Sequence, residues 1–213
     1  EYMAEFMEAY SRYFSENVLK KNVKEELDSW TISKRDPTAS YYLAIDVARY
    51  GRDDNAFVVS EIKKKKIRIV YAKISRRKDL TETAGMALVL DVQFHFKKIY
   101  IDSTGVGAGV VDILRERMMK SKIKEIIAIS RSTDDDKKIK TLKEDLYSNA
   151  LAQLEMGMVD LPKNKELMYS LRGITFSYTS YGNLRIYGKQ DHLADAFVMA
   201  CWGIKDYKKF FVM

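Results

Sequence analysis

Cysteine, proline and histidine are scarce in this chain, and the scarcity of cysteine excludes two kinds of protein. The 213 residues include one cysteine, Cys201, together with two prolines and two histidines. A single cysteine excludes an internal disulfide framework and a zinc site built from several cysteines. Cys201 lies in an apolar segment, so we interpret it as a small buried side chain.

Long apolar runs are also missing from the sequence. No segment approaches the roughly 18 apolar residues that a membrane-spanning helix requires. No positively charged stretch followed by an apolar stretch opens the chain, so a secretory leader is not indicated either. We therefore expect a soluble protein that is not secreted and has no membrane partner.

Composition and charge fit a globular protein that binds a polyanion. Hydrophobic residues make up 46% of the chain and aromatic residues 12%, which is enough to bury a core. The formal net charge is +7 at pH 7. A basic balance favours partners such as nucleic acids, although charge by itself does not identify one.

The first 36 residues differ in pattern from the rest. Aromatic residues from Tyr2 to Phe14 recur near helical spacing, which predicts an amphipathic helix, and Val18 to Leu27 predicts a second one. Pro37 breaks helices and favours extended structure in the residue before it. We therefore expect a helical linker segment over residues 1–36 and a single domain over residues 37–213.

From Tyr41 onwards the pattern predicts alternating strands and helices. Strands are expected at 41–48, 56–62, 67–74, 98–102 and 125–129, and helices at 80–96, 110–119, 142–155 and 191–207. The segments 174–178 and 184–187 are expected to pair as a further hairpin. This order predicts an α/β fold, in which a mixed five-stranded core sheet carries helices on both faces.

Three aspartates lie where a solvated carboxylate is not expected. Asp46 and Asp102 end apolar strands, and Asp195 lies in the apolar body of the last helix. A buried ionised carboxylate is costly unless it is paired or binds a metal. Oxygen ligands suit Mg²⁺ or Mn²⁺, so one shared cation site is predicted. The alternative for each acid is a helix cap or a lysine partner.

Two residues beside Asp195 are further candidates. Asp191 precedes the last helix, where it can cap the helix or support the metal ligands from outside. His192 lies three residues before Asp195 and can share its helix face. It can ligate a metal, orient water or carry a proton, and the alternative is an exposed histidine at a helix start.

Basic residues gather in two regions that we predict to contact DNA phosphates. Such contacts give binding that is independent of sequence and sensitive to salt. The alternative for Lys63–Lys66 is a solvated turn that protects a sheet edge. The predicted DNA-binding residues are Lys63, Lys64, Lys65, Lys66, Arg76, Arg77, Lys137, Lys138 and Lys143.

The order of the acidic motifs resembles that of the nuclease domain of the large terminase subunit of tailed viruses. AIDVARYGRDDNA (44–56) resembles its first motif, IDSTGVGAGVVD (101–112) its second, and DHLADA (191–196) its third. The helical stretch 143–157 and the following VDLP (159–162) also resemble that family. The resemblance covers about residues 1–205, and no Gly-x-x-x-x-Gly-Lys-[Ser/Thr] phosphate loop of an ATPase motor is present.

This resemblance implies an RNase H-like fold and a metal-dependent endonuclease. Asp46, Asp102 and Asp195 match the metal-binding acids, and His192 matches a histidine found in some members. Two Mg²⁺ or Mn²⁺ ions would then cut concatemeric double-stranded DNA during genome packaging in the host cytoplasm. The implied partners are an ATPase domain of the same polypeptide, a portal protein and a small terminase subunit.

Three other functions remain open from the sequence. A resolvase-type nuclease of the same fold would carry a similar set of acids. An actin-like ATPase would use a turn such as the one after Asp102, but it needs two such lobes. A non-catalytic module that docks the motor to the portal would have a silent metal site.

Overall fold

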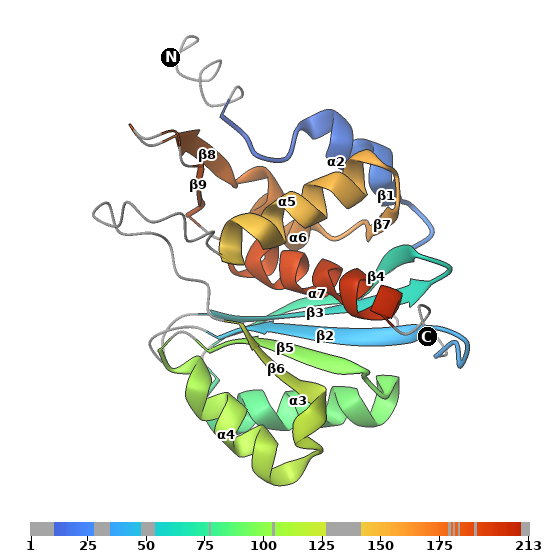
Figure 1. Ribbon diagram of the computed structural model, residues 1–213, viewed down its shortest axis with the longest axis vertical. Helices are drawn as coiled ribbons and strands as arrows, with labels where there is room; N and C mark the ends of the chain where they lie inside the picture. Colours follow the sequence, from blue (N-terminus) through green and yellow to red (C-terminus); the bar gives the residue numbers. More distant parts are fainter. Residues whose placement is uncertain are drawn as a thin grey trace.

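A mixed seven-stranded sheet forms the centre of the protein in a computed structural model (Figure 1). The structure describes residues 11–27, 35–47, 54–76, 78–103, 105–126, 142–178, 180, 182, 184–189 and 191–209. The order of the strands is β1-β7-β4-β3-β2-β5-β6. Only β3 runs antiparallel to its neighbours, and a separate two-stranded hairpin pairs β8 with β9. The strands are β1 (Val23–Lys24), β2 (Ser40–Asp46), β3 (Asp54–Lys63), β4 (Lys66–Arg76), β5 (Lys98–Asp102), β6 (Ile123–Ile126), β7 (Val159–Pro162), β8 (Thr175–Tyr178) and β9 (Leu184–Tyr187).

Helices cover both faces of this sheet, as the sequence predicts (Figure 1). On one face lie α3 and α4, and on the other lies α7, with α5 and α6 packed against it. The described part of the chain contains no helix that is long and apolar enough to cross a membrane. The helices are α2 (Glu16–Asn22), α3 (Leu80–Phe94), α4 (Gly107–Arg117), the 3-10 turn η1 (Lys120–Lys122), α5 (Leu142–Glu155), α6 (Lys165–Arg172) and α7 (His192–Lys209).

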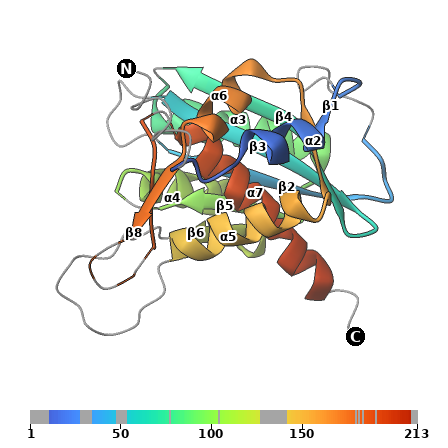
Figure 2. The same ribbon diagram turned by 90° about the horizontal axis from the view of Figure 1, so that it is seen from above.

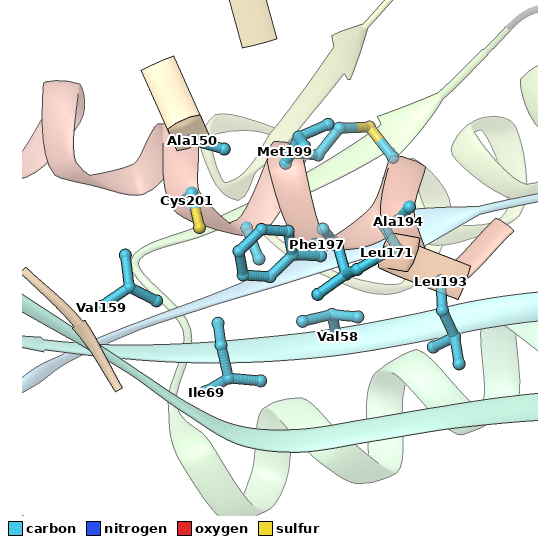
Figure 3. Packing of buried hydrophobic residues seen from close by; sticks show 14 of the residues in the cluster. Val58, Ile69, Ala150, Val159, Leu171, Leu193, Ala194, Phe197, Met199 and Cys201 are labelled. Carbon is cyan, nitrogen blue, oxygen red and sulfur yellow. The ribbon is translucent and has the colours of Figure 1, made fainter. Parts of the chain in front are cut away.

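Each face of the sheet has its own apolar core because side chains alternate along every strand. Leu43, Ile45 and Ile99 point towards α3 and α4. Val58 and Ile69 point to the opposite face, where Phe197 of α7 packs over them (Figure 3). The odd-numbered residues of β2 therefore lie under one helical layer, and its even-numbered residues under α7.

The strands and helices predicted from residue 41 onwards occur in the predicted order, but the sheet has seven strands where five were expected in its core, and the differences have local causes. The helix predicted from Val18 to Leu27 ends at Asn22, whose buried amide donates to the carbonyl oxygens of Val18 and Leu154. The next two residues then pair with β7 as β1. The helix expected from Tyr2 falls mostly on residues 1–10, outside the described residues, while the strand predicted at 125–129 runs over Ile123–Ile126.

The periodicity did not predict two further elements, the strand β7 in the sheet and the helix α6 that packs on β4 and on α7. β7 extends the sheet beside β4, and α6 follows it immediately. The side chain of Asn164 accepts from the backbone N–H of Leu167 and so caps α6, while its amide donates to the carbonyl of Ala72 in β4. α6 spans eight residues, fewer than the roughly ten to twelve that a helix assignment from periodicity requires, which explains why the sequence pattern missed it.

Candidate active site

Asp46 and Asp102 lie beside each other at the carboxyl ends of two parallel strands. β2 and β5 pair in register up to Ile45 and Ile101, and each aspartate is the next residue. Alternation directs both side chains towards the α7 face, because Ile45 and Ile101 belong to the opposite core. Asp46 is only 7% exposed, so its carboxylate is largely removed from water.

Gly107 allows the next helix to begin directly against Asp102. A Cβ atom on Gly107 would stand 1.9 Å from the carbonyl oxygen of Asp102 and 3.6 Å from Cβ of Val47. Only glycine permits this approach, which places the amino end of α4 at the carboxyl end of β5. The partial positive charge of a helix amino end favours negative groups nearby.

The first turn of α7 supplies the remaining acidic groups. Nδ1 of His192 lies 2.8 Å from Oδ2 of Asp46 and so connects α7 to β2. Asp195 follows three residues later on the same side of the helix, and its backbone N–H donates to the carbonyl of Asp191 at 2.7 Å. The structure thus brings the predicted residues of β2 and α7 together at one end of the sheet.

Helix α5 contributes two side chains that hold Asp195. Nζ of Lys143 donates to Oδ2 of Asp195 at 3.1 Å, and the hydroxyl of Tyr147 donates to Oδ1 at 2.6 Å. The same ammonium lies 3.7 Å from Oδ2 of Asp191. α5 and α7 pack against each other, which makes these contacts possible (Figure 2). Lys143, predicted as a DNA contact, is therefore placed among carboxylates.

Burial and like charges dominate the electrostatics of Asp46. Burial raises the pKa of the Asp46 carboxyl, the hydrogen bond with His192 opposes this rise, and the charges of Asp102 and Asp191 reinforce it. The hydrogen bond to Asp46 in turn raises the pKa of His192 to about 9. These mutual effects indicate that the acids of β2, β5 and α7 form one electrostatic cluster.

Asp195 and Lys143 respond to the same cluster. Burial raises the pKa of Asp195 to about 7; Lys143 counteracts the rise, whereas Asp46 and Asp191 add to it. Burial by itself would lower the pKa of Lys143, but the neighbouring carboxylates of Asp195 and Asp191 raise it above its ordinary value. An ionised carboxylate group at this position is thus costly, and Lys143 offsets part of that cost.

The donor chemistry of the cluster fits a hard divalent cation, but the side-chain positions do not converge on one. Among the described residues, no three His, Cys, Asp or Glu side chains form a group that could hold one metal ion. Asp46 is held by His192, and Asp195 by Lys143 and Tyr147. The single shared site predicted from the sequence therefore requires these carboxylates to turn away from their internal partners.

The predicted DNA-binding residues separate into two groups by position. Lys63 and Lys66 pair with each other across the turn from β3 to β4, at the end of the sheet where Ser40 begins β2. They are bound to Asp36 and Asp160, far from Asp46. Their neighbours Lys64 and Lys65 form the turn itself, with φ of 50° and 67°.

Arg76 lies at the other end of this hairpin, on the side of the acidic cluster. It pairs with Asp54 in β3, whose strand begins two residues before the partner of Asp46. Its side chain is 72% exposed, and its guanidinium also lies 3.7 Å from the carboxylate of Glu166. Arg77, Lys137 and Lys138 lie outside the described residues.

Tyr147 is the site residue that sequence reasoning missed. Its four-residue spacing from Lys143 places both on one face of α5, and this spacing was the only available signal. Tyrosine in a helix more often marks core packing, and the ring of Tyr147 does stack on the buried Phe14. The contact with Asp195 depends on the packing of α5 against α7, which no local pattern encodes.

The comparison with solved structures points to one architecture. No protein-family model matches the sequence, and no curated protein matches it. Among solved structures, the large terminase nuclease of thermophilic phage G20c with bound magnesium aligns with a TM-score of 0.73 and 18% identity, over 91% of this chain and 97% of that one. The Thermus phage P74-26 large terminase nuclease domain gives 0.67 and 18%, over 89% and 93%.

Two further structures extend this comparison. The nuclease domain of the large terminase subunit of bacterial virus Sf6, with manganese and beta-thujaplicinol, gives a TM-score of 0.68 and 15% identity, over 89% of this chain and 98% of that one. The large terminase of another thermophilic bacteriophage gives 0.66 and 14%, and 92% of this chain spans 45% of that longer protein. This chain has the fold of the nuclease domains of large terminases.

Proposed function

We propose that this chain is a metal-dependent endonuclease domain that cuts double-stranded DNA, as the nuclease part of a viral large terminase. The observation that carries the proposal is the acidic cluster. Carboxylates from β2, β5 and α7 gather at one end of the sheet, and among the described residues the cations that contact Asp46, Asp191 and Asp195 are Lys143 and His192. Structures with the same fold contain magnesium, cobalt or manganese, which supports a divalent cation as the further counter-charge.

The chemistry follows from the placement of the acids. Two Mg²⁺ or Mn²⁺ ions would supply an activated water and stabilise the oxygen that leaves the phosphorus. Asp46 and Asp102 would hold the cations from the sheet, and Asp195 would hold them from α7. Because the sheet and α7 are joined by a continuous apolar core, the backbones that carry the three carboxylates keep fixed relative positions, and only the side chains need to turn when cations bind.

His192 is suited to handle a proton during cleavage. With a pKa raised to about 9, its imidazole is protonated at both ring nitrogens at neutral pH, so that Nδ1–H donates to Asp46 and Nε2 carries the proton that can be transferred. Its side chain is 37% exposed, so the ring lies at the border between the cluster and solvent. This position allows the proton to pass to the departing 3′ oxygen or to water.

The proposal includes partners that the comparisons suggest only by analogy. Arg76, at the same end of the sheet as the cluster, is the best-placed described residue for a DNA phosphate. Arg77, Lys137 and Lys138 are proposed from the sequence to extend this contact. An ATPase domain of the same polypeptide, a portal protein and a small terminase subunit would complete the packaging machine.

Plasmid cleavage by the chain with Mn²⁺, Mg²⁺ or EDTA tests the proposal. We expect metal-dependent nicking that Asp46→Asn and Asp195→Asn each reduce by at least about 100-fold, since each removes a ligand charge. Asp160→Asn is the matched control: it neutralises another buried carboxylate of the same sheet, which pairs with Lys66 at the opposite end. This variant should cut like the wild type.

Two outcomes would contradict the proposal. Equal cutting by Asp46→Asn and wild type would exclude this cluster as the catalytic site. No cutting by the wild-type chain with either metal, together with tight binding to a portal protein, would favour the docking module instead.

A further inference from the structure

Both oxygens of the Asp195 carboxylate are engaged by one helix. Tyr147 donates to Oδ1 and Lys143 to Oδ2, and the two donors lie four residues apart on α5. The ammonium of Lys143 also lies 5.6 Å from the centre of the Tyr147 ring, so the two side chains support each other. Each oxygen of Asp195 thus already has an α5 donor.

The ammonium of Lys143 stands between two carboxylates. It lies 3.1 Å from Asp195 and 3.7 Å from Asp191, and its side chain is only 20% exposed. A positive charge shared by two acidic groups and shielded from water is the arrangement that a bound divalent cation has in a carboxylate site. The positive charge of Lys143 therefore stands beside Asp191 and Asp195, in the place that a bound cation would take.

The helix that carries Lys143 is anchored more firmly than the ammonium itself. Leu146, Ala150 and Leu154 are buried in the core, which fixes the backbone of α5. The four-carbon stem of a lysine can swing its charge without any movement of the helix. Exchange of Lys143 for another cation therefore requires a change of side-chain rotamer only.

We propose that Lys143 is a tethered counter-cation that neutralises Asp191 and Asp195 in the metal-free protein and leaves them when a divalent ion binds there. The inference rests on the proposed metal site, and it states which side chain a cation displaces on each side of that site. A cation on the Asp195 side must displace an ammonium, whereas a cation on the Asp46 side meets the imidazole of His192. Binding on the Asp195 side is consequently weakened in proportion to the strength of the lysine contacts.

Calorimetric titration with Mn²⁺ in the absence of DNA tests this inference. Lys143→Met keeps the length of the side chain and removes its charge, so we expect it to bind Mn²⁺ about tenfold tighter than the wild type. Its thermal stabilisation by Mn²⁺ should also be larger. Lys124→Met is the control, since Lys124 pairs with Asp206 at the other end of α7, and it should bind like the wild type.

A second measurement uses the unmodified protein, so it does not depend on the folding of a variant. Acylation of lysine amines, followed by mass spectrometry, should modify Lys143 several-fold faster once Mn²⁺ is bound, with Lys124 unchanged. Equal or weaker Mn²⁺ affinity of folded Lys143→Met, or unchanged labelling of Lys143, would overturn the inference and leave the metal site intact. A wild-type chain that binds no Mn²⁺ would overturn the proposed function and this inference together.

Discussion

The two ends of the central sheet both contain buried carboxylates, but they neutralise them differently. At the end where β2 begins, each buried acid has a base of its own: Asp160 lies 3.0 Å from Lys66, Glu61 lies 3.4 Å from Arg68, and Asp206 lies 3.6 Å from Lys124. Tyrosine hydroxyls complete the pairing, since Tyr41 donates to Glu61 and Tyr100 donates to Asp206. Each of these three carboxylates is therefore matched by a base.

At the end where β2 finishes, the described acids outnumber the described cations that contact them. Asp46, Asp191 and Asp195 share Lys143 and His192, and Asp102 adds its charge to theirs. Burying a carboxylate without a matching cation costs several kcal/mol in principle, which supports the proposal that a bound cation completes this cluster. Burial of an acid is therefore a weak sign of function, whereas an imbalance between acids and bases is a stronger one.

Asp195→Asn and Asp206→Asn each neutralise one carboxylate, at opposite ends of α7, and they should change the free energy of unfolding in opposite directions. Since the pKa of Asp195 is raised to about 7, its ionised form is disfavoured in the folded protein at pH 8, and Asp195→Asn should increase the free energy of unfolding by about 1–3 kcal/mol without metal. Asp206→Asn should decrease it by about 1–2 kcal/mol because it weakens the acceptor of Tyr100 and the partner of Lys124.

Urea denaturation in EDTA at pH 8 measures both changes. If the two variants lose stability equally, the two ends of the sheet are neutralised alike and the comparison fails. Added Mn²⁺ should stabilise the wild type and Asp206→Asn but should have little effect on Asp195→Asn.

The two ends of the first hairpin should also differ in their effect on DNA. Lys64 and Lys65 have left-handed backbones, so Lys64→Asn with Lys65→Gly relieves the turn and should add about 1 kcal/mol of stability. DNA affinity should stay unchanged, because this turn lies away from the acidic cluster. Arg76→Ala, at the cluster end, should weaken DNA binding about three- to tenfold at low salt.

Fluorescence anisotropy with a labelled duplex at several salt concentrations measures these affinities. A larger loss in the turn variant than in Arg76→Ala would place the DNA along the opposite end of the hairpin, as the run of four lysines by itself predicts.

The smallest expected effect is a dependence of stability on pH that His192 produces. Its pKa is raised to about 9 from an ordinary 6.5, so its stabilising contribution is complete below pH 6.5 and is lost as the pH rises through 9. The metal-free protein should lose a fraction of a kcal/mol between pH 7.5 and 9.5, since the side chain is more than a third exposed.

Thermal unfolding in EDTA across this pH range provides the measurement. His192→Asn should lose the slope, and His95→Asn should keep it, because His95 is exposed at the end of α3 and lies far along the chain from the cluster. A slope that persists in His192→Asn would assign the titration to another group.

The sequence indicated the acids of the candidate site because the apolar residues that mark each acid are its neighbours along the chain. The apolar strands around Asp46 and Asp102 and the apolar helix around Asp195 make each carboxylate conspicuous in the sequence. The extent of α5 was predicted to the residue for the same reason, since its apolar positions recur at helical spacing.

Tertiary contacts account for what the sequence did not predict. Lys143 and the Lys63–Lys66 turn look equally basic along the chain, yet one lies inside the cluster and the other at the far end of the sheet. The pairing of β1 with β7 likewise joins residues that are more than a hundred positions apart. Such placements depend on the packing of whole elements, and charge or periodicity alone does not encode them.

The contacts of the opening segment also give the molecule a mechanical property. Ser11 and Tyr13 bond through their backbones to Phe176 and Ile174, Glu16 binds Arg172, and Phe14 contacts Phe197 of α7. A pull on the chain at residue 11 would therefore load α6 and the β8–β9 hairpin before it loosens the sheet. Since the hydroxyl of Ser170 in α6 accepts from the backbone N–H of Ala194 in the first turn of α7, tension on α6 would pass to the turn that carries His192 and Asp195.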